Sequence, residues 1–236
     1  MIGNARPVVF AGPSIFGLDE TSFAGLEWRP PAARGAILAA LAGGAPAIGL
    51  IDGVYEHEPA IWHKEILYAL SLGVPVLGAA SMGALRAAEC AAFGVVGIGG
   101  IFAEYHTGAR TADADVAVLH APAELGHQPL TVALVDAEAT LAALLADGAV
   151  AWQGHDRLLA RARQLHFTQR TWAAICDDPG LRARAESWPS RKTEDARALL
   201  EMLRTGQFSA PAPFELNATG YLTGLARELG IRLERP

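Results

Sequence analysis

The chain has 236 residues, of which 51% are hydrophobic and 19% are charged, and its formal net charge is −6 at pH 7. This balance is typical of a folded globular protein and excludes an intrinsically disordered chain. The acidic net charge, together with the absence of any cluster of lysine and arginine, argues against nucleic-acid binding.

Short hydrophobic runs alternate with helical patterns through the first part of the chain. The runs predict strands at residues 8–11, 47–51 and 75–79. Hydrophobic residues at helical spacing predict helices at residues 34–42, 59–72 and 82–92. This alternation is typical of an α/β fold with a mostly parallel sheet flanked by helices. In such sheets, binding sites form beyond the carboxyl ends of the strands.

The middle of the chain is harder to interpret, and its end is helical. Residues 94–102 are rich in glycine and predict a loop that leads to another strand, and we expect further strands at residues 113–120 and 130–135. A helix should follow at residues 136–146, with Asp136 as its N-cap. Four more helices are expected, at residues 154–165, 169–176, 181–187 and 191–204. We therefore expect an α/β core over residues 1–150 and a helical C-terminal region over residues 151–236.

Three predicted strands are followed closely by a polar side chain, and Ser81 is the most informative of them. The other two are Ser14, in the turn Gly12-Pro-Ser14, and Asp52. Ala79-Ala-Ser-Met-Gly83 resembles a relaxed nucleophile elbow, in which small residues flank a serine between a strand and a helix. Two simpler interpretations stay open: Ser81 as a helix N-cap and Asp52 as a turn former.

A nucleophilic serine requires a base, and the basic residues are unusual. All but two of the 19 lysines and arginines are arginine, the exceptions being Lys64 and Lys192. Arginine cannot give up its proton, whereas a lysine near a helix N-terminus with apolar neighbours is shifted toward its neutral form. Lys64 fits that description, although it could also be an ordinary surface lysine. For a Ser-His-Asp site, four histidines lie near element ends, and their spacing selects none: His57, His63, His106 and His120.

Motifs for metals, cofactors and membranes are missing. His57-Glu58-Pro59 is not HExxH, the two cysteines form no CxxC, and Gly97-Ile-Gly-Gly100 does not complete GxGxxG. We therefore expect no metal and no cofactor. No uncharged run predicts a transmembrane helix, and the N-terminus lacks the apolar segment of a signal peptide. With so few cysteines, a cytoplasmic location is expected.

Several segments together resemble the TfuA-like protein family. The most specific are the two that contain Lys64 and Ser81. The matching segments are Val9-Phe-Ala-Gly-Pro-Ser14, Pro31-Ala-Ala-Arg-Gly35, Ile51-Asp-Gly-Val-Tyr55, Trp62-His-Lys-Glu-Ile-Leu67, Gly78-Ala-Ala-Ser-Met-Gly-Ala-Leu-Arg-Ala-Ala-Glu89 and Asp115-Val-Ala-Val-Leu-His120.

The resemblance implies a function in peptide backbone thioamidation. TfuA-like proteins accompany YcaO-type ATP-dependent enzymes and are understood to hydrolyse the thiocarboxylated C-terminus of ThiS, a ubiquitin-like sulfur carrier. The implied active site is a Ser-Lys pair, here Ser81 and Lys64, in a serine hydrolase-like enzyme.

Further residues complete the hypothetical site. The backbone N–H groups of Met82 and Gly83, with the turn from Gly12 to Ser14, would bind an oxyanion. Asp52 joins them as a substrate-binding candidate, and Arg86 could steady the thiocarboxylate or simply pair with Glu89. The alternatives are a non-enzymatic adaptor that docks a YcaO enzyme and a generic serine hydrolase.

Overall fold

A five-stranded parallel sheet forms the centre of the molecule. The computed structural model describes residues 5–56 and 58–234, and within them the strand order is β2-β1-β3-β4-β5. The strands are β1 (Val8–Phe10), β2 (Glu27–Arg29), β3 (Ile48–Leu50), β4 (Val76–Ala79) and β5 (Val96–Ile98), each parallel to its neighbours. The predicted α/β fold with a parallel sheet is confirmed.

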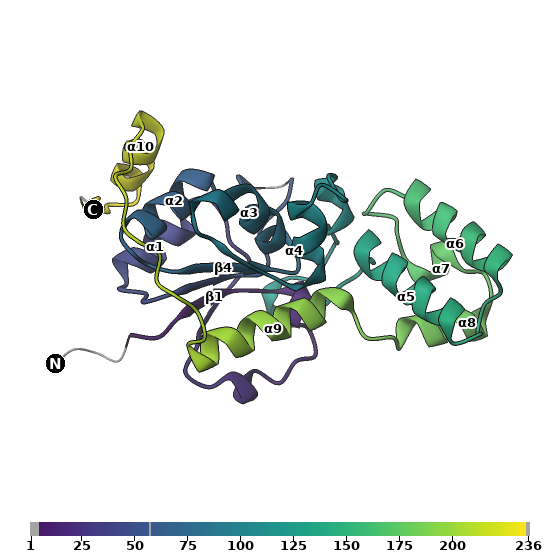
Figure 1. Ribbon diagram of the computed structural model, residues 1–236. Coiled ribbons are helices and arrows are strands. Elements are labelled where there is room, and N and C mark those ends of the chain that lie inside the picture. The colour runs from purple at the N-terminus through teal and green to yellow at the C-terminus, as the bar shows by residue number, and fades with distance from the viewer. Residues whose placement is uncertain (1–4, 57, 235–236) are drawn as a thin grey trace.

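Helices cover both faces of the sheet (Figure 1). On one face lie α1 (Ala36–Ala42), α2 (His63–Ser71), α3 (Met82–Cys90) and α4 (Gly99–His106). The other face is covered by α9 (Arg191–Thr205), whose Leu199 and Leu203 pack against Val9 and Leu77 of the strands. Because the inner strands are buried on both sides, they appear in the sequence as continuous hydrophobic runs, which made them predictable.

The remaining helices lie at the two ends of the sheet (Figure 1). At one end, α5 (Leu134–Ala146), α6 (Trp152–Gln164), α7 (Trp172–Ile175) and α8 (Pro179–Glu186) form a helical cluster. At the other end, α10 (Gly220–Glu228) packs on α1 and α2. The division at residue 150 stays a prediction, although α5 and α6, on either side of it, pack against each other.

Two predicted strands are wrong. Residues 113–120 begin with a short 3-10 helix (Asp113–Asp115) and continue without regular structure, because Val116 is buried beneath the helices of the first face instead of pairing with a strand. Within 130–135, Leu134 already belongs to α5. The N-cap of that helix is Ala133, so Asp136 lies inside the first turn.

Helix α2 starts at His63, later than the predicted residue 59. Ala60 forms a β-bridge with Ala33, which holds this part of the chain extended. The buried Glu65 carboxylate then accepts hydrogen bonds from the N–H groups of Trp62 (3.2 Å) and Gly35 (3.0 Å). Glu65 therefore caps α2 and attaches it to the start of α1.

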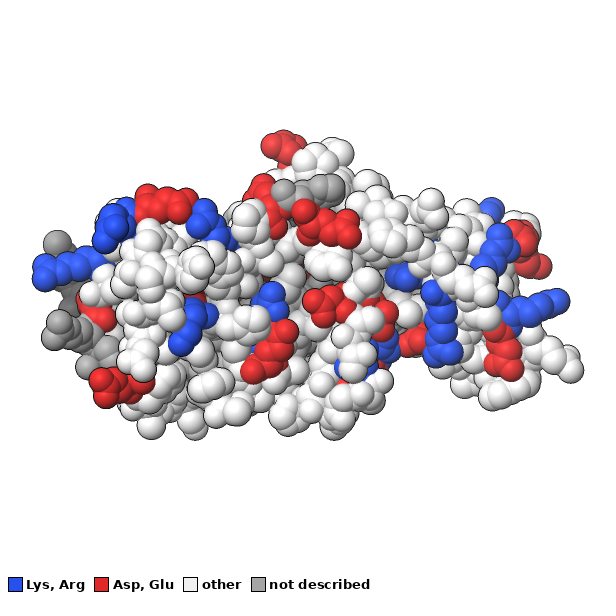
Figure 2. All heavy atoms as spheres, turned by 90° about the horizontal axis from the view of Figure 1, so that it is seen from above, with Lys and Arg blue, Asp and Glu red and all other residues white. Residues whose placement is uncertain are grey.

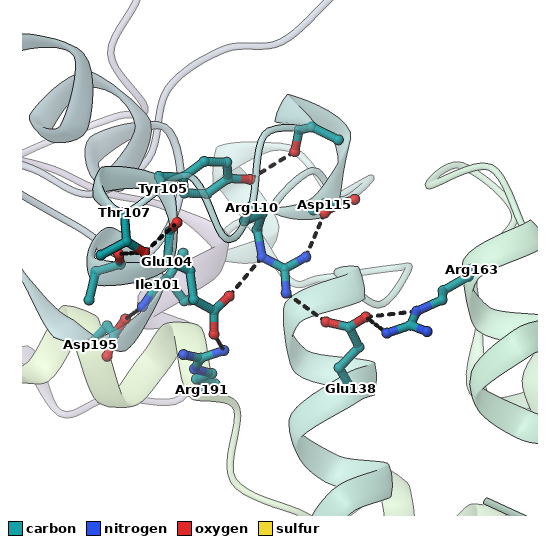
Figure 3. A network of polar contacts seen from close by, with 12 residues as sticks. Ile101, Glu104, Tyr105, Thr107, Arg110, Asp115, Glu138, Arg163, Arg191 and Asp195 are labelled. Atoms are coloured by element: carbon teal, nitrogen blue, oxygen red, sulfur yellow. Dashed lines mark hydrogen bonds and ion pairs between the residues drawn. The ribbon is translucent and has the colours of Figure 1, made fainter. Parts of the chain in front are cut away.

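A network of ion pairs connects the sheet to the helical cluster (Figure 3). Arg110 donates to Glu104 of α4 (2.8 Å), to Asp115 (2.5 Å) and to Glu138 of α5 (2.6 Å). Glu138 also accepts from Arg163 of α6, and Glu104 pairs with Arg191 of α9. The network thus joins α4, α5, α6 and α9, and the Arg110 side chain at its centre is 11% exposed.

The outer surface carries mixed charge. Figure 2 shows lysine and arginine side chains of the described residues scattered singly among acidic and uncharged ones on the face that carries α1 to α4. In the described part of the chain, no helix is both long enough and apolar enough to cross a membrane.

Candidate functional site

Ser81 lies on a sharp turn between β4 and α3. Ala80, just before it, has a φ of 65°, a left-handed conformation that costs a residue other than glycine about 1–2 kcal/mol. The Ser81 N–H donates to the Ala79 carbonyl at 2.8 Å, which tightens the turn. Ser81 is the N-cap residue of α3, but its side chain makes no capping hydrogen bond to the described helix. The strained turn agrees with the elbow pattern. The Ser81 hydroxyl does not cap α3, so the simpler interpretation of Ser81 as a capping side chain is wrong.

Two glycines let this turn pack directly on the sheet. A Cβ at Gly83 would collide with the Leu50 carbonyl, and one at Gly78 would collide with the Gly83 carbonyl. The Gly83 N–H donates to the Ile51 carbonyl at 3.0 Å, so this expected oxyanion donor already has an acceptor. The Met82 N–H, at the first position of α3, has no acceptor within its own helix. Of the two predicted N–H groups, Met82 is the better placed donor.

Asp52 fastens the loop after β1 to the end of β3. Its carboxylate is buried and accepts hydrogen bonds from the N–H groups of Gly12 (2.9 Å) and Ser14 (3.0 Å) and from the Ser14 hydroxyl (2.7 Å). Asp52 is therefore a structural clamp as well as a turn residue, and the N–H groups of this loop are engaged by it. Strands β1 and β3 are neighbours at the point where the strand order reverses, which is where open α/β sheets bind ligands.

A cavity of about 290 Å³ opens beside Ser81. Its wall combines the ends of β3 and β4 with residues from two distant segments. The described lining residues are Pro13, Asp52, Gly53, Val54, Tyr55, Glu58, Ser81, Met82, Leu85, Asp113, Val116, Ala117, Val118, Leu119, His120 and Phe167. The Phe167 ring, which follows α6, packs edge-on against Tyr55 with centroids 5.6 Å apart. The helical cluster thus contributes one wall of a cavity at the sheet edge.

The charge in this cavity is mostly negative. Three carboxylates line it, those of Asp52, Glu58 and Asp113, and no lysine or arginine occurs among its described lining residues. Burial raises the pKa of Tyr55, and the nearby Asp113 raises that pKa further. His120 is the one basic side chain of this described wall, and His57, another histidine candidate from the sequence, lies outside the described residues. Among the described residues, no group of His, Cys, Asp and Glu is arranged to hold a metal ion.

Two predicted site residues lie elsewhere. Lys64 is half-buried at the second position of α2 and is not among the residues that line the cavity. Arg86 pairs with Glu89 at 2.6 Å, as the simpler interpretation proposed, and is likewise absent from the lining. Glu89 also contacts His63 at 2.7 Å. Burial opposes ionisation of Glu89, but its bonds to His63 and Arg86 outweigh burial and lower its pKa.

The structure brings together only part of the predicted site. Ser81, Met82 and Asp52 line one cavity, and Gly12 and Ser14 are attached to it through Asp52. The sequence interpretation did not single out Phe167, which nothing in the local pattern could have placed here.

A second cavity of about 610 Å³ contains the other lysine. Lys192 is 2% exposed, and its Nζ donates to the Val116 carbonyl at 2.8 Å. Asp136, beside it, accepts from the Lys192 N–H and the Ser190 hydroxyl, each at 3.0 Å. Burial raises the pKa of Asp136, and the Lys192 charge acts in the opposite direction. Because lysine is rare in this sequence, its presence at position 192 could have drawn attention to this site.

The fold and the geometry of the site together identify the class of protein. The chain is an α/β protein with a serine on a strained strand-to-helix turn and a cavity at the carboxyl edge of a parallel sheet.

The family follows from a direct comparison. A model of the family described as TfuA-like protein matches residues 52–171, about half of the chain, so the chain belongs to the TfuA-like family. The matched segment contains every described lining residue of the Ser81 cavity except Pro13. No curated protein matches the sequence. Membership links the chain to peptide thioamidation and suggests an association with a YcaO-type partner.

Proposed function

We propose that this protein hydrolyses the thiocarboxylated C-terminus of a ThiS-like sulfur carrier and so supplies sulfide to a YcaO-type enzyme that thioamidates a peptide backbone. The observation that carries the proposal is the Ser81 hydroxyl, which lines a cavity at the N-terminus of α3 without capping that helix. Family membership supports a role in thioamidation, and the matched segment contains nearly all of the described residues that line the cavity.

The chemistry proceeds through an ester on Ser81. Its Oγ attacks the thiocarboxylate carbon, the C–O bond forms, the C–S bond breaks and hydrosulfide leaves. Water then cleaves the ester, which releases a carboxylate and restores the hydroxyl. The Met82 N–H and the positive end of α3 stabilise the oxyanion at each stage, where losing one donor typically costs about 2.7–4 kcal/mol.

The resemblance implies Lys64 as the base, and we keep this role as part of the proposal. For that role, Lys64 Nζ has to come within about 2.6–3.2 Å of Ser81 Oγ. Lys64→Arg retains the charge and removes the base, so it should abolish sulfide release if Lys64 is the base. Full activity of Lys64→Arg in a sulfide-release assay would exclude the Ser-Lys pair and leave the role of Ser81 intact.

Ser81→Ala tests the proposal itself. The variant should release no sulfide above background from a thiocarboxylated carrier and should form no covalent carrier adduct by intact-protein mass spectrometry. Ser187→Ala is a matched control, because the exposed Ser187 hydroxyl donates only to the Arg184 carbonyl, far along the chain in the helical cluster. Sulfide release by Ser81→Ala at the rate of the control would overturn the hydrolase proposal.

An adaptor without catalysis is the second candidate, and the charge of the cavity favours it. Three carboxylates in the wall disfavour an anionic thiocarboxylate. Sulfide supplied directly to the YcaO enzyme separates the two functions, because an adaptor stimulates thioamidation under that condition and a hydrolase has nothing to add. A generic serine hydrolase, the third possibility, would cleave p-nitrophenyl esters in a Ser81-dependent way.

A further inference from the structure

The cavity of about 610 Å³ that contains Lys192 is separate from the cavity beside Ser81. It opens where the start of α9 meets the helical cluster, at the end of the sheet on which α5 to α8 lie (Figure 1). Of its described lining residues, Pro13 and Val118 also line the Ser81 cavity. A volume in this range is typical of a binding site for a small organic molecule.

Lys192 is a buried cation with few partners. The residue is 2% exposed, and its ammonium group carries three N–H donors. One of them donates to the Val116 carbonyl at 2.8 Å, and Nζ forms no second hydrogen bond and no ion pair with a described residue. Because a buried charge is costly unless it is paired, this ammonium has both the need and the donors for a further acceptor.

Asp136 does not neutralise Lys192 by direct contact. The two hydrogen bonds that it accepts in the described structure come from the Ser190 hydroxyl and the Lys192 backbone N–H, and both go to Oδ1. The carboxylate therefore caps the start of α9, where the positive end of the helix balances its charge. The Lys192 ammonium acts on Asp136 only through space. Lys192 thus keeps the capacity to pair with one further anion.

The rest of the cavity wall is apolar or neutral. Half of the described lining residues are apolar, among them Trp172 and Trp188, and most of the others carry a hydroxyl group. The charged lining residues of the described chain are Asp136, Glu186 and Lys192. One ammonium matches the single charge of a carboxylate, whereas a phosphate brings about two negative charges. The two indoles offer apolar surface to a ring or a hydrocarbon chain.

We propose that this cavity binds a small monocarboxylate with an aromatic or hydrocarbon body. Its carboxylate pairs with the Lys192 ammonium, and its body packs against Trp172 and Trp188. The pair forms in a cavity largely shielded from water, where hydrogen bonds between charged groups are strongest. This site goes beyond the proposed function, because it does not depend on the chemistry at Ser81.

Isothermal titration calorimetry with three probes tests the class of ligand. Phenylacetate, phenylacetamide and phenethylamine share a ring and differ in the charge of the polar end. We expect phenylacetate to bind with a Kd of about 1 mM or tighter. The amide should bind about tenfold more weakly, because hydrogen bonds that join two charged groups are stronger than those to a neutral one. The amine should not bind, since it places a second cation beside Lys192. Equal or tighter binding of the amide or the amine would overturn the proposal, as would a lack of phenylacetate binding.

A matched pair of variants tests the location. Ala173 on α7 lines the cavity and Ala183 on α8 does not, and both residues are exposed. Ala173→Phe should fill part of the cavity and weaken phenylacetate binding by about tenfold or more, whereas Ala183→Phe should bind it like the wild type. Lys192→Met should abolish binding under conditions in which circular dichroism shows that it is folded. If that variant does not fold, the alanine pair and the three probes still decide.

The outcomes are independent of sulfide release. Wild-type affinity in Ala173→Phe, or equal losses in both alanine variants, would show that phenylacetate binds elsewhere and would overturn the proposal. Failure of the hydrolase proposal leaves this site in place, and failure of phenylacetate binding leaves the role of Ser81 untouched.

Discussion

Lys64 and Lys192 occupy the second position of α2 and α9, respectively, but the two helix starts lie in different surroundings. Lys64 is half-buried on the outer layer. Lys192 is 2% exposed, bonded to the Val116 carbonyl and close to Asp136. Both lysines therefore lie near a helix N-terminus. Only Lys192 is also covered by other segments of the chain, which is why it is buried and Lys64 is not. Sequence position identifies a helix start, whereas the tertiary fold decides how far it is desolvated.

The largest expected effect is the difference between Lys192→Met and Lys64→Met in the free energy of unfolding that each variant loses. Lys192→Met should reduce the free energy of unfolding by about 3 kcal/mol, because it leaves the Val116 carbonyl without its donor and Asp136 without its nearby cation. Lys64→Met should change that free energy by less than about 0.5 kcal/mol. Urea unfolding of both variants is the measurement, and equal losses would show that burial does not distinguish the two sites.

An intermediate effect is expected in the ion-pair network around Arg110, to which α9 is joined through Arg191 and Glu104. Arg110→Met should destabilise the fold by about 2 kcal/mol near neutral pH, because it removes the central donor of the network in Figure 3. Partial burial of Glu104 and Glu138 opposes ionisation, but hydrogen bonds and charges from Arg110, Arg191 and Arg163 outweigh it and lower the pKa of both carboxyls.

The pH dependence of the Arg110 effect follows from the sign of these shifts. Because the folded-state pKa values lie below the unfolded ones, the stabilisation is complete above the ordinary glutamate pKa of about 4.3 and is lost as the pH falls through the lowered values. The difference between wild type and Arg110→Met should therefore shrink in acid, as followed by urea unfolding at several pH values. A difference that grows in acid would contradict the network as described.

The smallest effect concerns a third helix start, that of α3. Ala79→Gly and Ala80→Gly each remove a buried methyl group, but only Ala80 has a left-handed φ. Ala80→Gly should therefore cost about 1 kcal/mol less than Ala79→Gly, because glycine relieves the strain at that position. Thermal unfolding of the two variants measures the difference, and equal costs would mean that the turn before Ser81 stores no strain.

The sheet was predictable where its strands are buried on both faces. Strand β2 was missed because it lies at the sheet edge, is half-buried and carries Glu27 and Arg29 paired with each other on its surface. Helix α10 was missed because Gly220 and Gly224 weaken its local helix signal. Packing of Leu222 on α1 and α2 stabilises that helix, and such packing is absent from any local pattern.

The candidate site was predictable to the extent that it follows strand ends. Ser14, Asp52 and Ser81 converge because parallel strands end at the same edge. His120 and Phe167 arrive from segments without regular structure, and sequence periodicity does not reveal where such segments fold back. Lys64 stays a prediction that rests on family resemblance, and the lining of the cavity gives it no additional support.

The contact between Asp136 and the start of α9 means that the polypeptide leaves the sheet and returns to it at nearly the same point. Asp136 accepts from the Ser190 hydroxyl and the Lys192 N–H, so helices α5 to α8 form a detour whose two ends are neighbours. Such closed excursions are natural units for insertion, deletion and exchange between proteins. A chain cut at residue 150 would keep half of this detour and lose α9, the cover of one whole sheet face. A short turn in place of residues 137–189 would keep both layers of the sheet covered.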